Sequence, residues 1–312
     1  QNTELEAYQQ IEKDLLDAVL YAPDNTAGNK TLFTKSVART LLAKIYAEKP
    51  LRDYAKVIRY CDEVKADGFD LVEDFNDLFG MNTAGTDAKM RNTKESILEA
   101  QFTPGAGNWC TWMFGRDLVN WNTNFTWAKW VTPSRDLINA FKKEGDEVRF
   151  KESVVYYDCK WSNYYPSDNY PFMYKCRSAN SSIIKYRYAD VLLLKAEALI
   201  MQDTPDLDGA ADIIDEVRER AKLGALSAST RSNKNAMLNA LLKERRLELA
   251  FEGQRWFDLV RLDKVEEVMN AVYAKDSGRK AQVYAFDKTS YRLPIPQSVI
   301  DANDKIHQNP GY

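Results

Sequence analysis

The sequence holds few of the residues that metal and disulfide chemistry needs. It has one histidine, His307, and its four cysteines are far apart, with no C-x-x-C pair. Zinc in proteins is normally held by several His, Cys or carboxylate ligands, so a zinc site is hard to build here. The sequence therefore predicts no metal site. A disulfide between Cys159 and Cys176 and a pair of buried free thiols both remain open.

Long apolar runs and one-sided charge are also missing. No stretch of about 18 apolar residues occurs, so no membrane-spanning helix is expected. The net charge is −3 and the 43 Lys and Arg residues are spread along the chain, which argues against a nucleic-acid partner. Hydrophobic residues make up 45% and charged residues 29%, as in ordinary globular proteins. No signal peptide is present and the chain opens at Gln1 without Met, which indicates a mature or truncated form.

Amphipathic helices dominate both ends of the chain. Apolar residues recur at helical spacing over residues 4–21, 35–48, 53–66, 189–202 and 209–223, and from residue 232 to Gly253. The segment ARTLLAK at Ala38–Lys44 is echoed by ADVLLLK at Ala189–Lys195. Each segment opens a helix pair of about 34 residues, the tetratricopeptide (TPR) period, although generic helical bundles show similar pairs. We predict a mainly α fold of TPR-like stacked helical hairpins, with a long irregular insertion and a few short strands.

The stretch Ser232–Asp263 is expected to organise this scaffold. Glu244, Glu248 and Glu252 recur every four residues, and like charges at that spacing repel on an isolated helix. We therefore expect arginines from elsewhere in the chain to meet them in a buried web of ion pairs. Gly253 is expected to end the helix in a left-handed cap. A second short helix would follow, with possible Arg255–Asp258 and Asp258–Arg261 pairs and with inward-facing Trp256, Phe257 and Val260.

Residues 74–182 differ from the helical blocks in composition. Five of the seven tryptophans lie between Trp109 and Trp130, interleaved with asparagines. A second aromatic loop covers 156–174, a helix is expected at 133–141, and short strands are expected at 95–102 and 182–188. Aromatic rings can stack on the apolar face of a sugar while short polar side chains bind its hydroxyls. The alternative is that these tryptophans form the core of the insertion itself.

Several motifs together resemble the SusD/RagB family. They are ERRLELAFEGQRWFDLVR at Glu244–Arg261, YRLPIP at Tyr291–Pro296, the terminal QNPGY, RYADVLLLKAEAL at Arg187–Leu199, ESILEAQF at Glu95–Phe102, and TPSRDLINAF followed by Asp146 and Arg149. The resemblance implies a non-catalytic outer-membrane lipoprotein, without a required cofactor, on the surface of a Gram-negative bacterium. Such a protein would bind oligosaccharides, or peptides in the RagB branch, and would cap a TonB-dependent SusC-like transporter. Its N-terminal portion, with the lipid anchor, would precede this chain and could supply part of the site.

The resemblance also places the ligand site in the insertion. We divide the chain into TPR-like hairpins (1–73), a loop-rich binding insertion (74–182), and further hairpins with an extended tail (183–312), all forming one SusD-like unit. We choose candidate residues by their position in the Trp-rich segment: aromatic rings that could stack on a sugar (called plates) and polar side chains that could bind its hydroxyls. A second group lies in the next aromatic loop. The candidates are Trp109, Trp112, Trp121 and Trp130 as plates, Arg116, Asn120 and Asn122 for hydroxyls, and Trp161 and Tyr164 as the second group.

Two other classes of protein remain as alternatives. A glycoside hydrolase needs two carboxylates facing one cleft about 5–10 Å apart. Asp117 and Asp136 are the acids nearest the tryptophans, but no pattern pairs them, and Asp146 and Glu147 fit better as helix-end charges. The second alternative is an intracellular TPR scaffold that binds peptides. We expect a binding protein rather than an enzyme.

Overall fold

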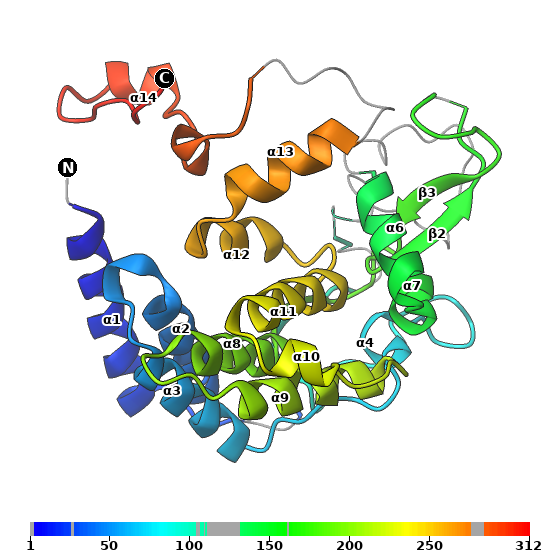
Figure 1. Cartoon of the computed structure of the whole chain (residues 1–312), viewed down its shortest axis with the longest axis horizontal. Coiled ribbons are helices and arrows are strands. Elements are labelled where there is room, and N and C mark those ends of the chain that lie inside the picture. The colour runs from blue at the N-terminus through cyan, green and yellow to red at the C-terminus, as the bar shows by residue number, and fades with distance from the viewer. Residues whose placement is uncertain are drawn as a thin grey trace.

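Helices make up about half of the residues that the structure describes. The computed structural model describes residues 3–25, 28–103, 107–108, 110, 132–160, 162–275 and 284–312. Antiparallel helices form the lower layer in Figure 1: α1 (Glu4–Tyr21), α2 (Lys35–Ala47), α3 (Tyr54–Ala66), α8 (Tyr188–Met201), α9 (Leu207–Arg220) and α11 (Lys234–Glu248). This confirms the mainly α, TPR-like fold expected from the sequence, with the helix limits shifted by a few residues.

The two helical blocks share one hydrophobic core. Helix α2 packs between α1 and α3, α3 packs on α8, and α8 packs on both α9 and α11. Small residues let the helices approach closely, since Ala43 and Ala196 are both fully buried. Core side chains from the two blocks, such as Val37 and Leu193, belong to the same cluster. Residues about 150 positions apart are thereby fixed relative to one another.

Side chains just before several helices cap the first turn by accepting hydrogen bonds from its backbone amides. Thr3 and Glu6 form a reciprocal capping box at the start of α1. The Asp53 side chain accepts from the Lys56 amide (3.0 Å) at the start of α3. Asp206 accepts from the Gly209 amide (2.9 Å) before α9, so the acidic turn before that helix supplies its N-terminal cap.

The insertion carries short helices and two small sheets. The helices are α4 (Asn76–Phe79), α6 (Arg135–Glu144) and α7 (Glu147–Ser153). Strand β1 (Ser96–Ala100) pairs antiparallel with β4 (Ile183–Arg187), as the two predicted strands allow. Strands β2 (Val154–Tyr157) and β3 (Tyr170–Met173) form an antiparallel hairpin. The sequence had predicted only an aromatic loop at 156–174, so the ends of that loop are strand, and the loop proper is 158–169.

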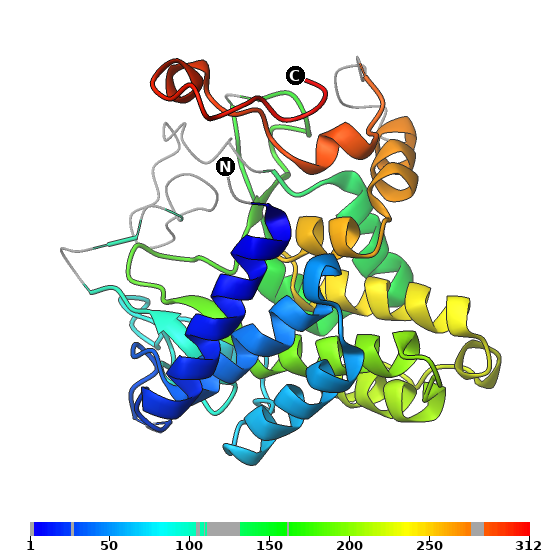
Figure 2. The same ribbon diagram turned by 90° about the vertical axis from the view of Figure 1, so that its left-hand side faces the viewer.

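The C-terminal part lies across the upper side of the helical layer. After α10 (Ala228–Arg231) and α11 come α12 (Arg255–Arg261), α13 (Val265–Lys275) and α14 (Gln297–Asp301), with 3-10 turns at Lys49–Leu51 and Lys288–Tyr291. Figure 2 shows the tail running over the end of the molecule away from α3 and α9. Among the described helices, none has the length and apolar content needed to cross a bilayer.

Three local predictions need correction. Phe257 is 62% exposed rather than inward-facing. Arg255 donates to the Leu242 carbonyl (3.0 Å) instead of pairing with Asp258. Helix α11 ends at Glu248, before Gly253, because a turn with left-handed Phe251 (φ 66°) follows it, and Gly253 (φ 77°) closes that turn. No disulfide joins Cys159 to Cys176, and both thiols are buried, so the buried-thiol alternative holds.

Candidate ligand-binding site

An open hollow of about 940 Å³ lies between the loop 158–169 and the start of helix α6. We call it the tyrosine hollow. Its polar side chains can bond hydroxyl groups, and its two tyrosines offer flat apolar surface. Its lining consists of Arg135, Lys160, Ser162, Asn163, Tyr164, Tyr165, Pro166 and Ser167.

The β2–β3 hairpin supports the wall of this hollow. Strand register pairs Tyr157 with Tyr170, and the loop returns through a hydrogen bond from the Cys159 amide to the Ser167 carbonyl (2.6 Å). Beneath it, buried Cys159, Tyr170 and Phe172 form a small core on which Tyr164 and Tyr165 pack. The hollow is therefore built on a packed satellite core rather than on a bare loop.

Two tyrosine rings and an arginine contact one another in the hollow. The rings of Tyr164 and Tyr165 meet edge to face, with centroids 4.9 Å apart and an interplanar angle of 88°. The Arg135 guanidinium carbon lies 4.0 Å from the Tyr164 centroid and 4.4 Å from that of Tyr165. Arg135 also donates to the Tyr164 carbonyl, and the Tyr165 hydroxyl donates to the Pro133 carbonyl (2.8 Å). These contacts fix the ring orientations before any ligand arrives.

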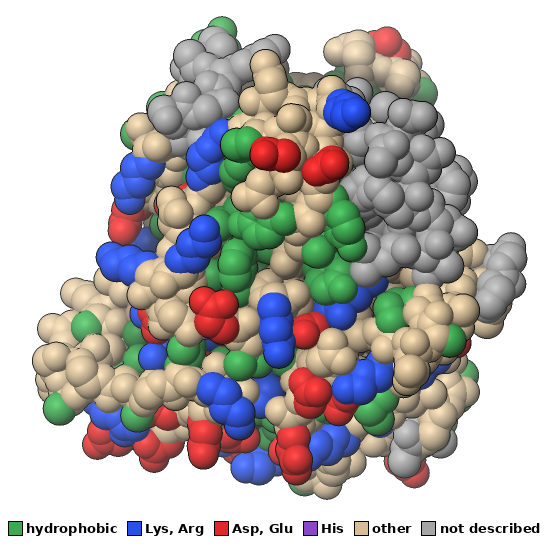
Figure 3. Space-filling model, turned by 90° about the vertical axis from the view of Figure 1, so that its right-hand side faces the viewer, with side chains coloured by type: hydrophobic (Ala, Val, Ile, Leu, Met, Phe, Trp, Pro, Cys, Tyr) green, Lys and Arg blue, Asp and Glu red, His purple; other side chains and the backbone are tan. Residues whose placement is uncertain are grey.

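A second, more enclosed cavity of about 440 Å³ lies beside strand β4 and the turn after α11. Phe79, Met173 and Phe251 give it a largely apolar lining. Lys175 also lines it, pairing with Glu252 (2.5 Å). Burial lowers the pKa of the Lys175 ammonium to about 8, against the attraction of Glu252. On the face shown in Figure 3, apolar side chains gather beside the residues not described, above a zone of mixed charges.

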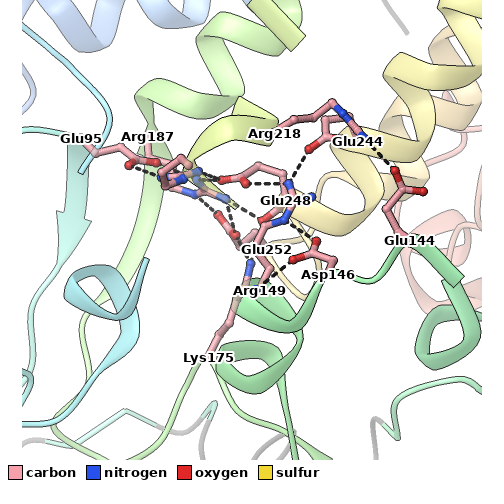
Figure 4. A network of polar contacts seen from close by, with 11 residues as sticks. Glu95, Glu144, Asp146, Arg149, Lys175, Arg187, Arg218, Glu244, Glu248 and Glu252 are labelled. Atoms are coloured by element: carbon pink, nitrogen blue, oxygen red, sulfur yellow. Dashed lines mark hydrogen bonds and ion pairs between the residues drawn. The ribbon is translucent and has the colours of Figure 1, made fainter. Parts of the chain in front are cut away.

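Figure 4 shows the expected web of ion pairs around the glutamates of α11 and of the turn that follows it. Glu248 on α11 is fully buried and pairs with arginines from three other elements, namely Arg149 of α7, Arg187 at the end of β4, and Arg220 of α9. Glu244 pairs with Arg149 (2.5 Å) and Arg218 (3.3 Å). This confirms that the glutamates of α11 meet arginines from elsewhere. We call this set, with Glu95, Glu144, Asp146, Lys175 and Glu252, the glutamate web.

Electrostatics within the glutamate web favour a structural role. Burial acts to raise the pKa of Glu248, but Arg220, Arg187 and Arg149 hold that pKa well below its usual value. A neighbouring cluster joins Arg245 to Asp190 and Asp258 (2.8 Å each) and Arg261 to Glu197 (2.7 Å). Glu248, held charged by three guanidinium groups, is therefore a poor proton donor and a poor base at neutral pH.

Asp136 and Asp146 have structural partners, and Asp117, another acid considered for hydrolysis, lies outside the described residues. Within the described ranges, no group of three or more His, Cys, Asp or Glu side chains could hold a metal ion. Asp136, one acid considered for hydrolysis, pairs with Arg246 (2.7 Å). Asp146 caps α7 by accepting from the Arg149 amide (3.1 Å). The lining of the tyrosine hollow offers aromatic rings for stacking and polar side chains for hydrogen bonding.

A family model described as the SusD family matches residues 79–312. The chain belongs to the SusD family. The matched segment contains all the motifs that had indicated the resemblance. It also contains the tyrosine hollow and the glutamate web.

Known SusD-like proteins match the chain in sequence and fold. SusD-like protein P2 of Formosa agariphila is 33% identical over 142 residues, covering 44% of this chain and 27% of that protein. A SusD-like protein of Bacteroides ovatus is 27% identical over 303 residues, covering 83% and 51%. The matches thus span about half or less of these curated relatives. Surface glycan-binding protein A from Bacteroides thetaiotaomicron, solved with laminarihexaose, has the same fold (TM-score 0.75, 19% identity, 97% and 70% covered).

Only one of the predicted site residues falls within the described part of this SusD-family chain. Tyr164 lines the tyrosine hollow; its role as a sugar plate stays a prediction. Arg135, Lys160 and Tyr165 also line the hollow, but they were not predicted as site residues. The helix start in TPSRDL and the adjacent Tyr164 and Tyr165 are visible in the sequence, but no local pattern shows that the two segments lie side by side. The other predicted residues lie outside the described residues: Trp109, Trp112, Arg116, Asn120, Trp121, Asn122, Trp130 and Trp161.

Proposed function

We propose that this protein binds an oligosaccharide at the bacterial cell surface and passes it, without chemical change, to a TonB-dependent SusC-like transporter in the outer membrane. The observation that carries the proposal is the match of the SusD family model to residues 79–312. Surface glycan-binding protein A, whose fold this chain shares, was solved with a glucan oligosaccharide. Membrane attachment would come from an N-terminal lipid anchor.

The tyrosine hollow supplies chemistry that suits this role. Half-buried Tyr164 and Tyr165 provide apolar ring surface, and Ser162 and Asn163 provide short hydrogen-bonding groups beside it. A stacked sugar ring contributes on the order of 1 kcal/mol, so a site with a few such contacts holds its ligand weakly. Weak capture is compatible with release into a transporter.

Binding and delivery are tested separately. Isothermal titration of the purified protein against a panel of oligosaccharides should give saturable binding without release of reducing ends. Appearance of reducing ends would identify a hydrolase instead, and binding of peptides alone would identify a RagB-like peptide carrier. Co-purification of a SusC-like transporter from solubilised outer membranes supports delivery, whereas recovery of the protein in the cytosolic fraction contradicts the proposed location.

A further inference from the structure

The described lining of the tyrosine hollow carries charge of one sign. Of the eight described residues that line it, Arg135 and Lys160 are cationic and none is acidic. Lys160 is exposed to solvent. The Arg135 guanidinium is held over the two tyrosine rings, 4.0 and 4.4 Å from their centroids. The positive charge therefore sits directly beside the apolar surface on which a sugar ring would stack.

The start of helix α6 adds to this positive potential. Arg135 is the first residue of α6, a helix of ten residues, and Ser134 caps it by accepting from the Leu137 amide (3.1 Å). The amide groups of a helix's first turn carry partial positive charge, which favours anions near that end. This contribution is independent of the two side chains and has the same sign.

The nearby described carboxylates do not line the hollow. Asp136, the second residue of α6, pairs with Arg246 (2.7 Å) and does not line the hollow. Asp158 and Asp168 belong to the same loop as Lys160, but both are exposed and neither is among the lining residues. Since the charged side chains in its described lining are both cationic, the hollow favours ligands that carry negative charge.

We propose that the glycan bound in the tyrosine hollow is acidic, carrying uronate carboxylates or sulfate esters along its chain. This inference rests on the proposed glycan binding and narrows its ligand class. One sugar ring stacks at Tyr164 and Tyr165, while its anionic substituent lies near Lys160 and the start of α6. Arginine and lysine both bind such anionic oxygens through charge-assisted hydrogen bonds.

Pairs of oligosaccharides that differ only in their charged groups show whether ligand charge affects the affinity. The purified protein is titrated with polygalacturonate oligosaccharides and with the same oligosaccharides after carboxyl reduction, then with a sulfated galactan oligosaccharide and its desulfated form. We expect each acidic ligand that binds to bind at least fivefold more tightly than its neutral partner. Raising the salt from about 20 to 500 mM should weaken only the acidic ligand, since salt screens exposed charges.

A charge-removing variant tests the position. Lys160→Gln should weaken the acidic ligand about two- to fivefold, the range expected for an exposed ion pair, and leave the neutral ligand unchanged. Lys13→Gln, which removes an exposed lysine on α1, should change neither affinity. An equal effect of Lys160→Gln on both ligands would overturn the proposal.

The outcomes distinguish this inference from the proposed function. Equal or tighter binding of the neutral glycans overturns the acidic preference and leaves glycan binding intact. Failure to bind every oligosaccharide, with tight binding of an oligoglutamate peptide, overturns both. Preference for the carboxylated or the sulfated member identifies which anionic group the hollow recognises, and either result supports the proposal.

Discussion

At the scale of single residues, the proposed glycan recognition depends most directly on Tyr164, the predicted site residue that lines the tyrosine hollow. Its ring contacts Tyr165 edge to face and Arg135 through the guanidinium group. Arg135 also bonds the Tyr164 carbonyl, so both the ring and its backbone are held. A plate fixed in this way loses little conformational entropy when a sugar stacks on it.

Replacement of Tyr164 by alanine should weaken glycan binding about fivefold. The expected loss is one stacking contact of about 1 kcal/mol. Isothermal titration with the tightest oligosaccharide found measures the effect. Tyr284→Ala is the matched control, because Tyr284 is 85% exposed and lies outside the hollow; it should leave the affinity unchanged. Equal affinities of Tyr164→Ala and the native protein would remove Tyr164 from the site.

At the scale of secondary-structure elements, α11 links the scaffold to the insertion. Its apolar side, including Met237 and Leu241, enters the main core. Its glutamates face arginines from α7, α9 and the end of β4. Leu247 packs on Leu137 and Phe141 of α6, the helix whose first residue lines the tyrosine hollow. The position of the hollow therefore depends on the packing of α11.

Removing the charge of Glu248 should strongly destabilise the fold. Glu248→Gln leaves three buried arginines with too little negative charge, and loss of one partner in a buried ion pair typically costs about 3–5 kcal/mol. Guanidinium denaturation followed by circular dichroism measures the change in midpoint. Glu267→Gln on α13 is the control, since that side chain is 66% exposed and should change the midpoint little. Similar midpoints for both variants would show that the glutamate web contributes little to stability.

At the scale of the whole molecule, buried ion pairs join the two helical blocks. Lys44 of α2 pairs with Asp190 of α8 (2.7 Å), and Asp190 also pairs with Arg245 of α11 (2.8 Å). Burial of Asp190 acts to raise its pKa, but Lys44 and Arg245 hold the pKa of that carboxyl well below its usual value. One carboxylate therefore connects three helices, provided that it stays charged.

This arrangement predicts loss of stability in acid. Because the folded pKa of Asp190 lies below its unfolded value of about 3.9, its contribution is fully present above about pH 5. It is lost as the pH falls toward the folded pKa, since the unfolded chain takes up the proton first. Asp190→Asn should lower the free energy of unfolding by about 3 kcal/mol at pH 7. The gap to the native protein should narrow between pH 5 and pH 2.5.

Urea denaturation at several pH values measures this gap. Asp203→Asn, a substitution at an exposed turn, serves as the control and should give a small gap at every pH. A gap for Asp190→Asn that stays constant down to pH 2.5 would contradict the assigned charge state.

Sequence alone determined the helical scaffold and the family. Helical periodicity and capping depend on residues three or four positions apart, so α1, α2, α3, α8 and α9 were predicted to within a few residues. The unusual spacing of Glu244, Glu248 and Glu252 also required distant arginines, and the structure supplied them.

Only the tertiary structure decided where recognition could occur. Strands β2 and β3 lie far enough apart in sequence that their pairing leaves no local pattern. The hairpin that brings Tyr164 to Arg135 was therefore not predicted. Phe257 followed the apolar spacing of its neighbours yet is exposed, since no element covers it among the described residues. Local spacing fixes which residues form helices, whereas contacts between distant segments fix which side chains face a ligand, and those contacts depend on the packing of the whole chain.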